Sequence, residues 1–217
     1  MEERYRETHI TWDNIAQLYE ERFMELDLYD DTYKRFCDLL PTPAASVLEI
    51  GCGPGNITRR ILTINPDLKI LATDISKNMV DLAKRNNPGI EAQVLDCRYL
   101  KDFDTKRERI ICGFTIPFLS KIDCTNLIAN CSLLLKEKGI LYLSFVAGDY
   151  EKSGFKTATK GDRVYFYYHK LNKVKQDLAL NHLVVVDIYN KDFSKSDGES
   201  ETHTVLVAMK QASNAAE

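Results

Sequence analysis

The sequence predicts an α/β fold in which a mostly parallel sheet carries helices on both faces. From Ser46 onward, short apolar runs alternate with helical patterns, which is typical of a parallel sheet. A glycine-rich turn, residues 51–55, follows the first run and precedes a helix. Three runs end at or beside a carboxylate, Glu49, Asp74 or Asp96. Because the carboxyl ends of parallel strands meet at one edge, these carboxylates predict a ligand site there.

Length and composition indicate one soluble domain. The 217 residues suit a single core, and no apolar tract is long enough to span a bilayer. The charged start, residues 1–10, lacks the apolar core of a signal peptide. The formal charge is −3 with no basic stripe, so we expect neither a nucleic-acid nor a membrane partner. The six cysteines form no C-x-x-C pair, which favours reduced thiols and a cytoplasmic protein.

Two helices are predicted before the first strand. Residues 11–23 show helical spacing of apolar side chains, with Thr11 placed to cap the helix. Residues 29–40 show a second such pattern, which Pro41 and Pro43 end. The aromatic stripe of the first helix suits either core packing or a cap over the ligand edge, and Tyr19 could serve as both.

The middle of the chain supplies the parallel strands and their helices. The strands are expected at residues 46–50, 69–73, 90–95, 109–114 and 140–146. The helices are expected at residues 56–64, 76–86 and 123–135, and a polar turn at 136–139 introduces the last strand.

The last third changes character. We expect a loop at 148–162, a short aromatic strand at 163–168 and a helix at 170–181. Strands at 183–189 and 204–208, joined by a polar loop at 194–201, predict an antiparallel hairpin on the sheet. Residues after Lys210 are expected to form a disordered tail.

The glycine turn carries a family resemblance. Dinucleotide sites have the spacing G-x-G-x-x-G, whereas here Gly51, Gly53 and Gly55 alternate and Glu49 precedes them. Residues 47–55 thereby resemble the first motif of the class I S-adenosylmethionine-dependent methyltransferases. The alternative is a structural turn in another α/β protein. The resemblance implies a doubly wound, Rossmann-like, seven-stranded sheet whose last strand lies between the fifth and sixth.

The resemblance divides the single domain, residues 1–217, into four parts. It covers residues 47–146 well and the flanking parts less specifically. Residues 1–43 would form a helical cap and residues 44–146 the cofactor-binding core. Residues 147–210 would form the acceptor side, the last helix and the hairpin, and residues 211–217 the tail.

The resemblance also implies cofactor contacts at matching positions. Asp74 would accept hydrogen bonds from the ribose hydroxyls, although it could instead be a helix cap before Ser76. Asp96 and the Cys97 N–H would face adenine, and Glu49 would lie near the methionine end. The whole predicted set for S-adenosyl-L-methionine is Tyr19, Glu49, Gly51, Cys52, Gly53, Asn56, Asp74, Ile75, Met79, Asp96, Cys97, Gly113 and Phe114.

A general base is needed only if the acceptor is protonated at working pH. Strand alternation places Tyr167 and His169 on one face of the aromatic strand, with Phe166 turned to the core, so we predict Tyr167 and His169 at the acceptor pocket. The other candidates are His9, expected in a mobile terminus, and His182, expected at a helix end. No metal site is predicted, since His, Asp and Glu do not cluster at ligand spacings.

The predicted function is methyl transfer to a small-molecule acceptor. The [Asp/Asn/Ser]-Pro-Pro-aromatic motif with which many nucleic-acid and protein methylases hold a planar nitrogen is absent after the fourth strand, where residues 112–118 read CGFTIPF. Alternatives are a methyltransferase acting on RNA or protein, a non-catalytic cofactor-binding partner subunit and, more remotely, a nicotinamide oxidoreductase.

Overall fold

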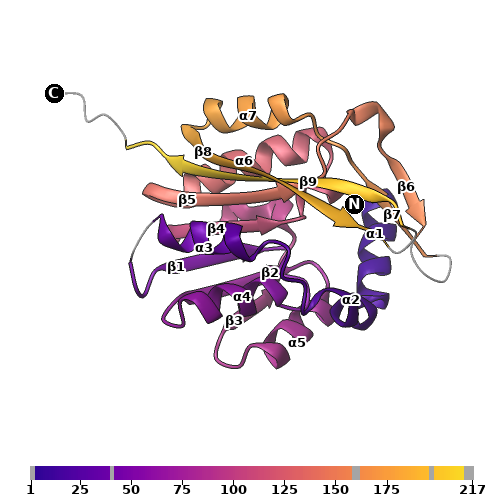
Figure 1. Cartoon of the computed structure of the whole chain (residues 1–217), viewed down its shortest axis with the longest axis horizontal. Coiled ribbons are helices and arrows are strands. Elements are labelled where there is room, and N and C mark those ends of the chain that lie inside the picture. The colour runs from indigo at the N-terminus through magenta and orange to yellow at the C-terminus, as the bar shows by residue number, and fades with distance from the viewer. Residues whose placement is uncertain (1–2, 40–41, 158–161, 196–197, 213–217) are drawn as a thin grey trace.

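A seven-stranded sheet forms the centre of the molecule, with strand order β3-β2-β1-β4-β5-β9-β8 (Figure 1). A computed structural model describes residues 3–39, 42–157, 162–195 and 198–212. Strands β1 to β5 run parallel, and β9 pairs antiparallel with both β5 and β8, as predicted. The strands of this sheet are β1 Ser46–Ile50, β2 Lys69–Asp74, β3 Glu91–Val94, β4 Arg107–Gly113, β5 Leu135–Phe145, β8 Leu183–Ser194 and β9 Ser200–Lys210.

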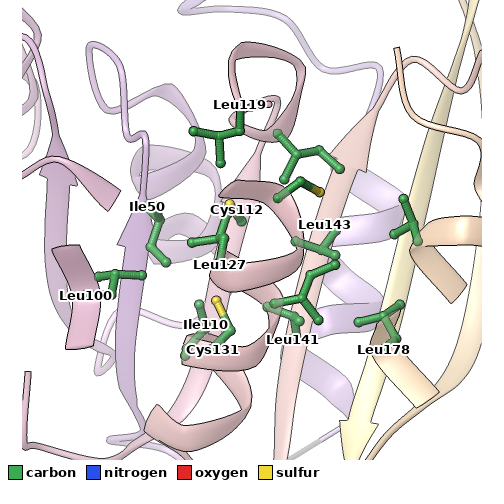
Figure 2. Close-up of a cluster of buried hydrophobic side chains, with 14 of the residues drawn as sticks. Ile50, Leu100, Ile110, Cys112, Leu119, Leu127, Cys131, Leu141, Leu143 and Leu178 are labelled. Atoms are coloured by element: carbon green, nitrogen blue, oxygen red, sulfur yellow. The ribbon is translucent and has the colours of Figure 1, made fainter. Parts of the chain in front are cut away.

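Helices cover both faces of the sheet, so the chain has two core layers. On one face α6 and α7 bury an aliphatic layer, in which Leu127 and Cys131 of α6 lie over β1, β4 and β5 (Figure 2). On the other face α3, α4 and α5 bury the second layer. None of the described helices is long and apolar enough to cross a membrane. These helices are α3 Asp30–Asp38, α4 Asn56–Ile64, α5 Lys77–Asn86, α6 Lys121–Leu134 and α7 Leu171–Leu180, with short turns η1 Cys97–Asp102, η2 Ile116–Phe118 and η3 Tyr150–Lys152.

Local sequence signals explain where the core helices begin. The Ser76 hydroxyl accepts the Met79 N–H at 3.1 Å and caps α5, and Ser120 caps α6 in the same way. Gly55 precedes α4 with φ +84°, a left-handed conformation that glycine adopts readily. The helix starts therefore lie within two residues of the predicted positions.

The N-terminal helix differs from the prediction. Two helices, α1 (Glu3–Asn14) and α2 (Ala16–Phe23), replace the single helix expected at 11–23, and they meet at Ile15. Thr11 does not cap a helix. It lies inside α1, 2% exposed, and donates a hydrogen bond to the Arg163 carbonyl at 2.9 Å.

Hydrogen bonds explain why the start of this helix was mispredicted. The Thr8 hydroxyl accepts the Tyr165 N–H at 2.9 Å, one helical turn before Thr11. The face of α1 that packs on the later strand is therefore polar in sequence but buried in the fold. A search for periodic apolar residues does not detect such a face.

The segment expected as a loop contains a strand. Strands β6 (Gly154–Thr157) and β7 (Arg163–Phe166) form a separate two-stranded antiparallel sheet that packs beside α1 (Figure 1). Strand β7 ends at Phe166, two residues before the predicted end.

The hairpin and β5 are longer than expected. Strand β5 begins at Leu135, and the turn predicted at 136–139 is a bulge in it, where Lys138 has φ +60° and the register with β4 shifts. The hairpin strands extend into the loop predicted at 194–201, because β9 already begins at Ser200. Most of the predicted tail, residues 213–217, lies outside the described residues.

Candidate functional site

A cavity of ≈320 Å³ opens at the carboxyl edge of the parallel strands and is covered by α1 and α2. Its lining draws on the ends of β2 and β4, on the start of β9, and on the loops that follow β1, β2, β3 and β4. Twelve of the thirteen predicted cofactor residues line it. They are Tyr19, Gly51, Cys52, Gly53, Asn56, Asp74, Ile75, Met79, Asp96, Cys97, Gly113 and Phe114.

The three glycines of the turn serve two purposes. All three have positive φ, but a Cβ on Gly51 would lie 2.3 Å from the Thr115 hydroxyl, and one on Gly55 would lie 2.3 Å from Asn87 Nδ2. A Cβ on Gly53 would meet nothing closer than the Tyr19 ring at 3.6 Å. Gly51 and Gly55 are therefore required by packing, whereas Gly53 leaves free space that faces the cavity.

Asp74 joins the turn to the second strand. Its carboxylate accepts the Gly53 N–H and the Ser76 N–H, both at 2.9 Å. Burial raises the pKa of Asp74, and these backbone donors oppose that shift. Asp74 therefore holds the glycine turn and presents a polar group to the cavity, whereas the cap of α5 is Ser76 and not Asp74.

Glu49 is the predicted residue that does not line the cavity. Its side chain points away from the edge into the layer under α4, where the Thr58 hydroxyl donates to Oε2. The carboxyl is fully buried, and Oε1 has no hydrogen-bond partner among the described residues. Burial raises its pKa to about 8, so Glu49 is largely protonated at neutral pH.

Asp96 lines the cavity but is already paired. Its carboxylate accepts hydrogen bonds from the Arg98 backbone N–H at 3.0 Å and from Arg98 Nε at 2.9 Å. The Arg98 guanidinium lies 4.2 Å from the centre of the Tyr5 ring. Arg98 and Tyr5 were not predicted, and both line the cavity beside Asp96.

The N-terminal helices close the cavity. Asp13 of α1 accepts the Ser76 hydroxyl at 2.7 Å and the Asn78 N–H at 3.0 Å, which ties α1 to the start of α5. Trp12 and Tyr19 line the cavity with ring centres 5.4 Å apart. The aromatic stripe thus lies over the ligand edge. His9, expected in a mobile terminus, lies in α1 and lines the cavity as well.

The predicted acceptor residues lie elsewhere. Tyr167 is 1% exposed and His169 5% exposed, and neither lines the cavity. His169 Nε2 is 2.9 Å from the Ile116 carbonyl, and Tyr167 packs in the aliphatic layer between α6 and the sheet. Phe166 lines the cavity instead, the reverse of the predicted facing. His182, which follows α7 with φ +57°, is also outside the lining.

The alternation holds, and the error lay in which face was assigned to the pocket. Tyr165 and Tyr167, with ring centres 4.6 Å apart, both pack on the buried cluster that α6 covers, and Phe166 between them lines the cavity. The prediction assigns apolar Phe166 to the core side, but the cavity is itself lined by aromatic side chains. Strand β7 ends at Phe166, and the Tyr167 N–H then donates to the Pro117 carbonyl at 2.7 Å.

A polar cluster at the opposite end of the cavity from Arg98 escaped prediction. Its members are Tyr29, which precedes α3, and Glu201 and His203 of β9. The Tyr29 hydroxyl is 2.5 Å from His203 Nδ1, and Glu201 Oε2 is 3.5 Å from His203 Nε2. Burial lowers the pKa of His203, and Glu201 opposes that shift. We refer to these three side chains as the Tyr29–His203–Glu201 chain.

A sequence signal for this cluster existed. Glu201 and His203 stand two residues apart and so share one face of a strand. The predicted strand began at residue 204, which left both in a loop. Among the described residues, no three His, Cys, Asp or Glu side chains gather as a metal ion would require.

The core of the chain is similar to known proteins. Residues 47–139 match a family model described as a methyltransferase domain. The tRNA N(3)-methylcytidine methyltransferase of Schizosaccharomyces pombe is 34% identical over 90 residues, 39% of this chain and 35% of that protein. The mitochondrial ubiquinone biosynthesis O-methyltransferase of Saccharomyces cerevisiae is 28% identical over 128 residues, 56% of this chain and 40% of that protein. The matched parts are thus well under half the length of both relatives.

A solved structure extends the likeness to almost the whole chain. An S-adenosylmethionine-dependent methyltransferase from Clostridium acetobutylicum aligns with a TM-score of 0.69 and 15% identity, over 93% of this chain and 99% of that one. At this identity the likeness concerns the fold, and it extends well beyond residues 47–139 of the family model.

Proposed function

Because the chain carries a class I S-adenosylmethionine-dependent methyltransferase domain, we propose that it transfers a methyl group from S-adenosyl-L-methionine to a small-molecule acceptor. The observation that carries this proposal is a single covered cavity. It runs from the glycine turn and Asp74 at one side to the aromatic side chains around Phe114 at the other. Cofactor and acceptor would therefore share one space under α1 and α2.

The residues at the glycine turn fit the cofactor. The free space at Gly53 lets a ligand approach bare backbone, as the methionine part would need. Asp74 has carboxylate lone pairs left for the ribose hydroxyls after its two backbone donors. Met79 and Ile75 offer apolar contact for the adenine ring. The cofactor supplies a methyl group already activated by its sulfonium, so the protein's main task is alignment.

The lining of the cavity favours a small acceptor without negative charge. Arg98 is the one lysine or arginine among the described residues that line it, and Arg98 is held by Asp96. A polynucleotide would bring phosphates that need several cations. The net charge of −3 points the same way. The tRNA-modifying relative from S. pombe remains the reason to test RNA directly.

Two measurements test the proposal. Calorimetric titration with S-adenosylhomocysteine, with NAD as control, should show binding of the first ligand alone. Incubation with methyl-labelled S-adenosylmethionine and separate small-molecule, RNA and protein fractions of a cell extract should label the small-molecule fraction. Label in RNA or protein would support the alternative acceptor classes. Tight binding with no labelled fraction would support a non-catalytic cofactor-binding subunit.

A further inference from the structure

We infer that the Tyr29–His203–Glu201 chain is a proton relay that deprotonates the acceptor, and that the acceptor is a small aromatic molecule with a hydroxyl nucleophile. The inference rests on the proposed function and names its acceptor class and base. Tyr29 and His203 would be catalytic residues, and Glu201 would position His203.

The contacts place His203 between Glu201 and Tyr29. Glu201 Oε2 faces His203 Nε2, which favours the imidazole tautomer that carries its proton on Nε2. Nδ1 is then an acceptor, and the Tyr29 hydroxyl at 2.5 Å is its donor. The phenol oxygen of Tyr29 keeps a lone pair for a proton from the cavity. Tyr29 and His203 are 5% and 7% exposed, so the relay is shielded from bulk water but lines the cavity.

The charges around His203 make it a base. Burial keeps the imidazole neutral, since it lowers the pKa of His203. Glu201 lies on its own strand, and Lys195 lies 3.3 Å from Glu201 Oε1. Lys191 stands opposite His203 on β8, and its ammonium is 2.6 Å from Asp31 Oδ2. Glu201 is thus the carboxylate within contact of the imidazole, ready to stabilise the imidazolium that forms on proton transfer.

His9 is the other histidine in the lining, and it lies at the wrong end. His9 lies one helical turn before Asp13 on α1, and Asp13 accepts the Ser76 hydroxyl and the Asn78 N–H, so His9 lies on the side of Asp74, the carboxylate predicted to face ribose. His203 lies beside Phe114, with ring centres 4.6 Å apart, next to the carboxyl end of β4.

Aromatic side chains define the acceptor class at this end. The Phe193 ring stacks on His203 at 4.9 Å with 15° between the planes, and the Tyr29 and Phe114 rings are 5.7 Å apart. Such surfaces suit a planar ring. The described lysines and arginines that line the cavity do not reach this end, since Arg98 lies beside Asp96, so an acidic acceptor would lack a counter-charge. A phenol combines a planar uncharged ring with a nucleophile that must lose a proton.

The bonds, electrons and proton of the methyl transfer all balance within these groups. The acceptor oxygen forms a bond to the methyl carbon while the sulfur–carbon bond breaks, and the electron pair of that bond stays on sulfur as a thioether. The acceptor proton passes to the Tyr29 oxygen as the Tyr29 proton passes to His203 Nδ1. The product is an aryl methyl ether beside an imidazolium that Glu201 faces.

Kinetics with simple phenols test the relay. The probes are phenol, catechol and 4-nitrophenol with methyl-labelled cofactor, and the methoxy counterparts are blanks. The wild-type chain should methylate at least one phenol, and His203→Asn and Tyr29→Phe should lower kcat by about 100-fold or more, as loss of a general base does. S-adenosylhomocysteine affinity should stay unchanged in both variants. His182→Asn is the matched control, since His182 is outside the cavity and its φ of +57° suits asparagine.

A second readout follows the imidazole itself. Side-chain NMR titration of the resting protein should give His203 a lower pKa in Glu201→Gln than in the wild type, and the kcat profile of that variant should shift to lower pH. A wild-type protein that binds S-adenosylhomocysteine but methylates no phenol overturns the acceptor class. Full activity in His203→Asn overturns the relay. Absence of S-adenosylhomocysteine binding in the wild type removes the proposed function as well.

Discussion

The buried carboxyl of Glu49 should make the free energy of unfolding depend on pH. The carboxyl is fully buried, and its pKa in the folded state is about 8 against 4.5 for the free group. At each pH between those values the unfolded chain releases this proton while the folded chain keeps it. The free energy of unfolding therefore falls as pH rises through this window, by about 1.4 kcal/mol per pH unit. The full effect is about 5 kcal/mol, reached above pH 8.

Glu49→Gln isolates this contribution. Glutamine has the same shape, accepts the Thr58 hydroxyl through its amide oxygen and cannot ionise. Urea unfolding of both proteins at pH 5, 6, 7 and 8 should show the wild type losing stability with pH relative to the variant. All other titrating groups are shared, so they cancel in the difference. A difference that stays constant with pH would show that Glu49 ionises normally and would refute the reasoning.

Four further substitutions test the site. Asp74→Ala should weaken S-adenosylhomocysteine binding by about 2–3 kcal/mol, because hydrogen bonds to a charged acceptor are lost; an unchanged calorimetric Kd in a folded variant would contradict this role. Gly53→Val should abolish cofactor binding yet leave a folded protein by circular dichroism, whereas Gly51→Val should unfold it, since a Cβ there meets Thr115 at 2.3 Å. Tyr167→Phe should leave kcat unchanged, because Tyr167 is buried outside the cavity; a large loss of kcat would restore it as a site residue.

The sequence by itself determined the parallel core and twelve of the residues that line the cavity at its carboxyl edge. The turn at Gly51 to Gly55 was predictable because it depends on neighbouring residues alone. The position of strand-end groups such as Asp74 was predictable, because each strand–helix repeat returns the chain to the same edge of the sheet. Glu49 shows the limit of that argument, since the same strand that carries it to the edge turns its side chain under α4.

Only the tertiary structure brings together the Tyr29–His203–Glu201 chain. Tyr29 and His203 are 174 residues apart in the chain, and no local sequence pattern predicts their contact. Thr11 and Tyr167 were misplaced for a related reason. Thr11 is buried through a hydrogen bond to a strand 152 residues away, and the face that carries Tyr167 packs on the core while Phe166 lines the cavity. Periodicity reports which face of an element is apolar, whereas packing between distant elements decides which faces become core and which enclose the cavity.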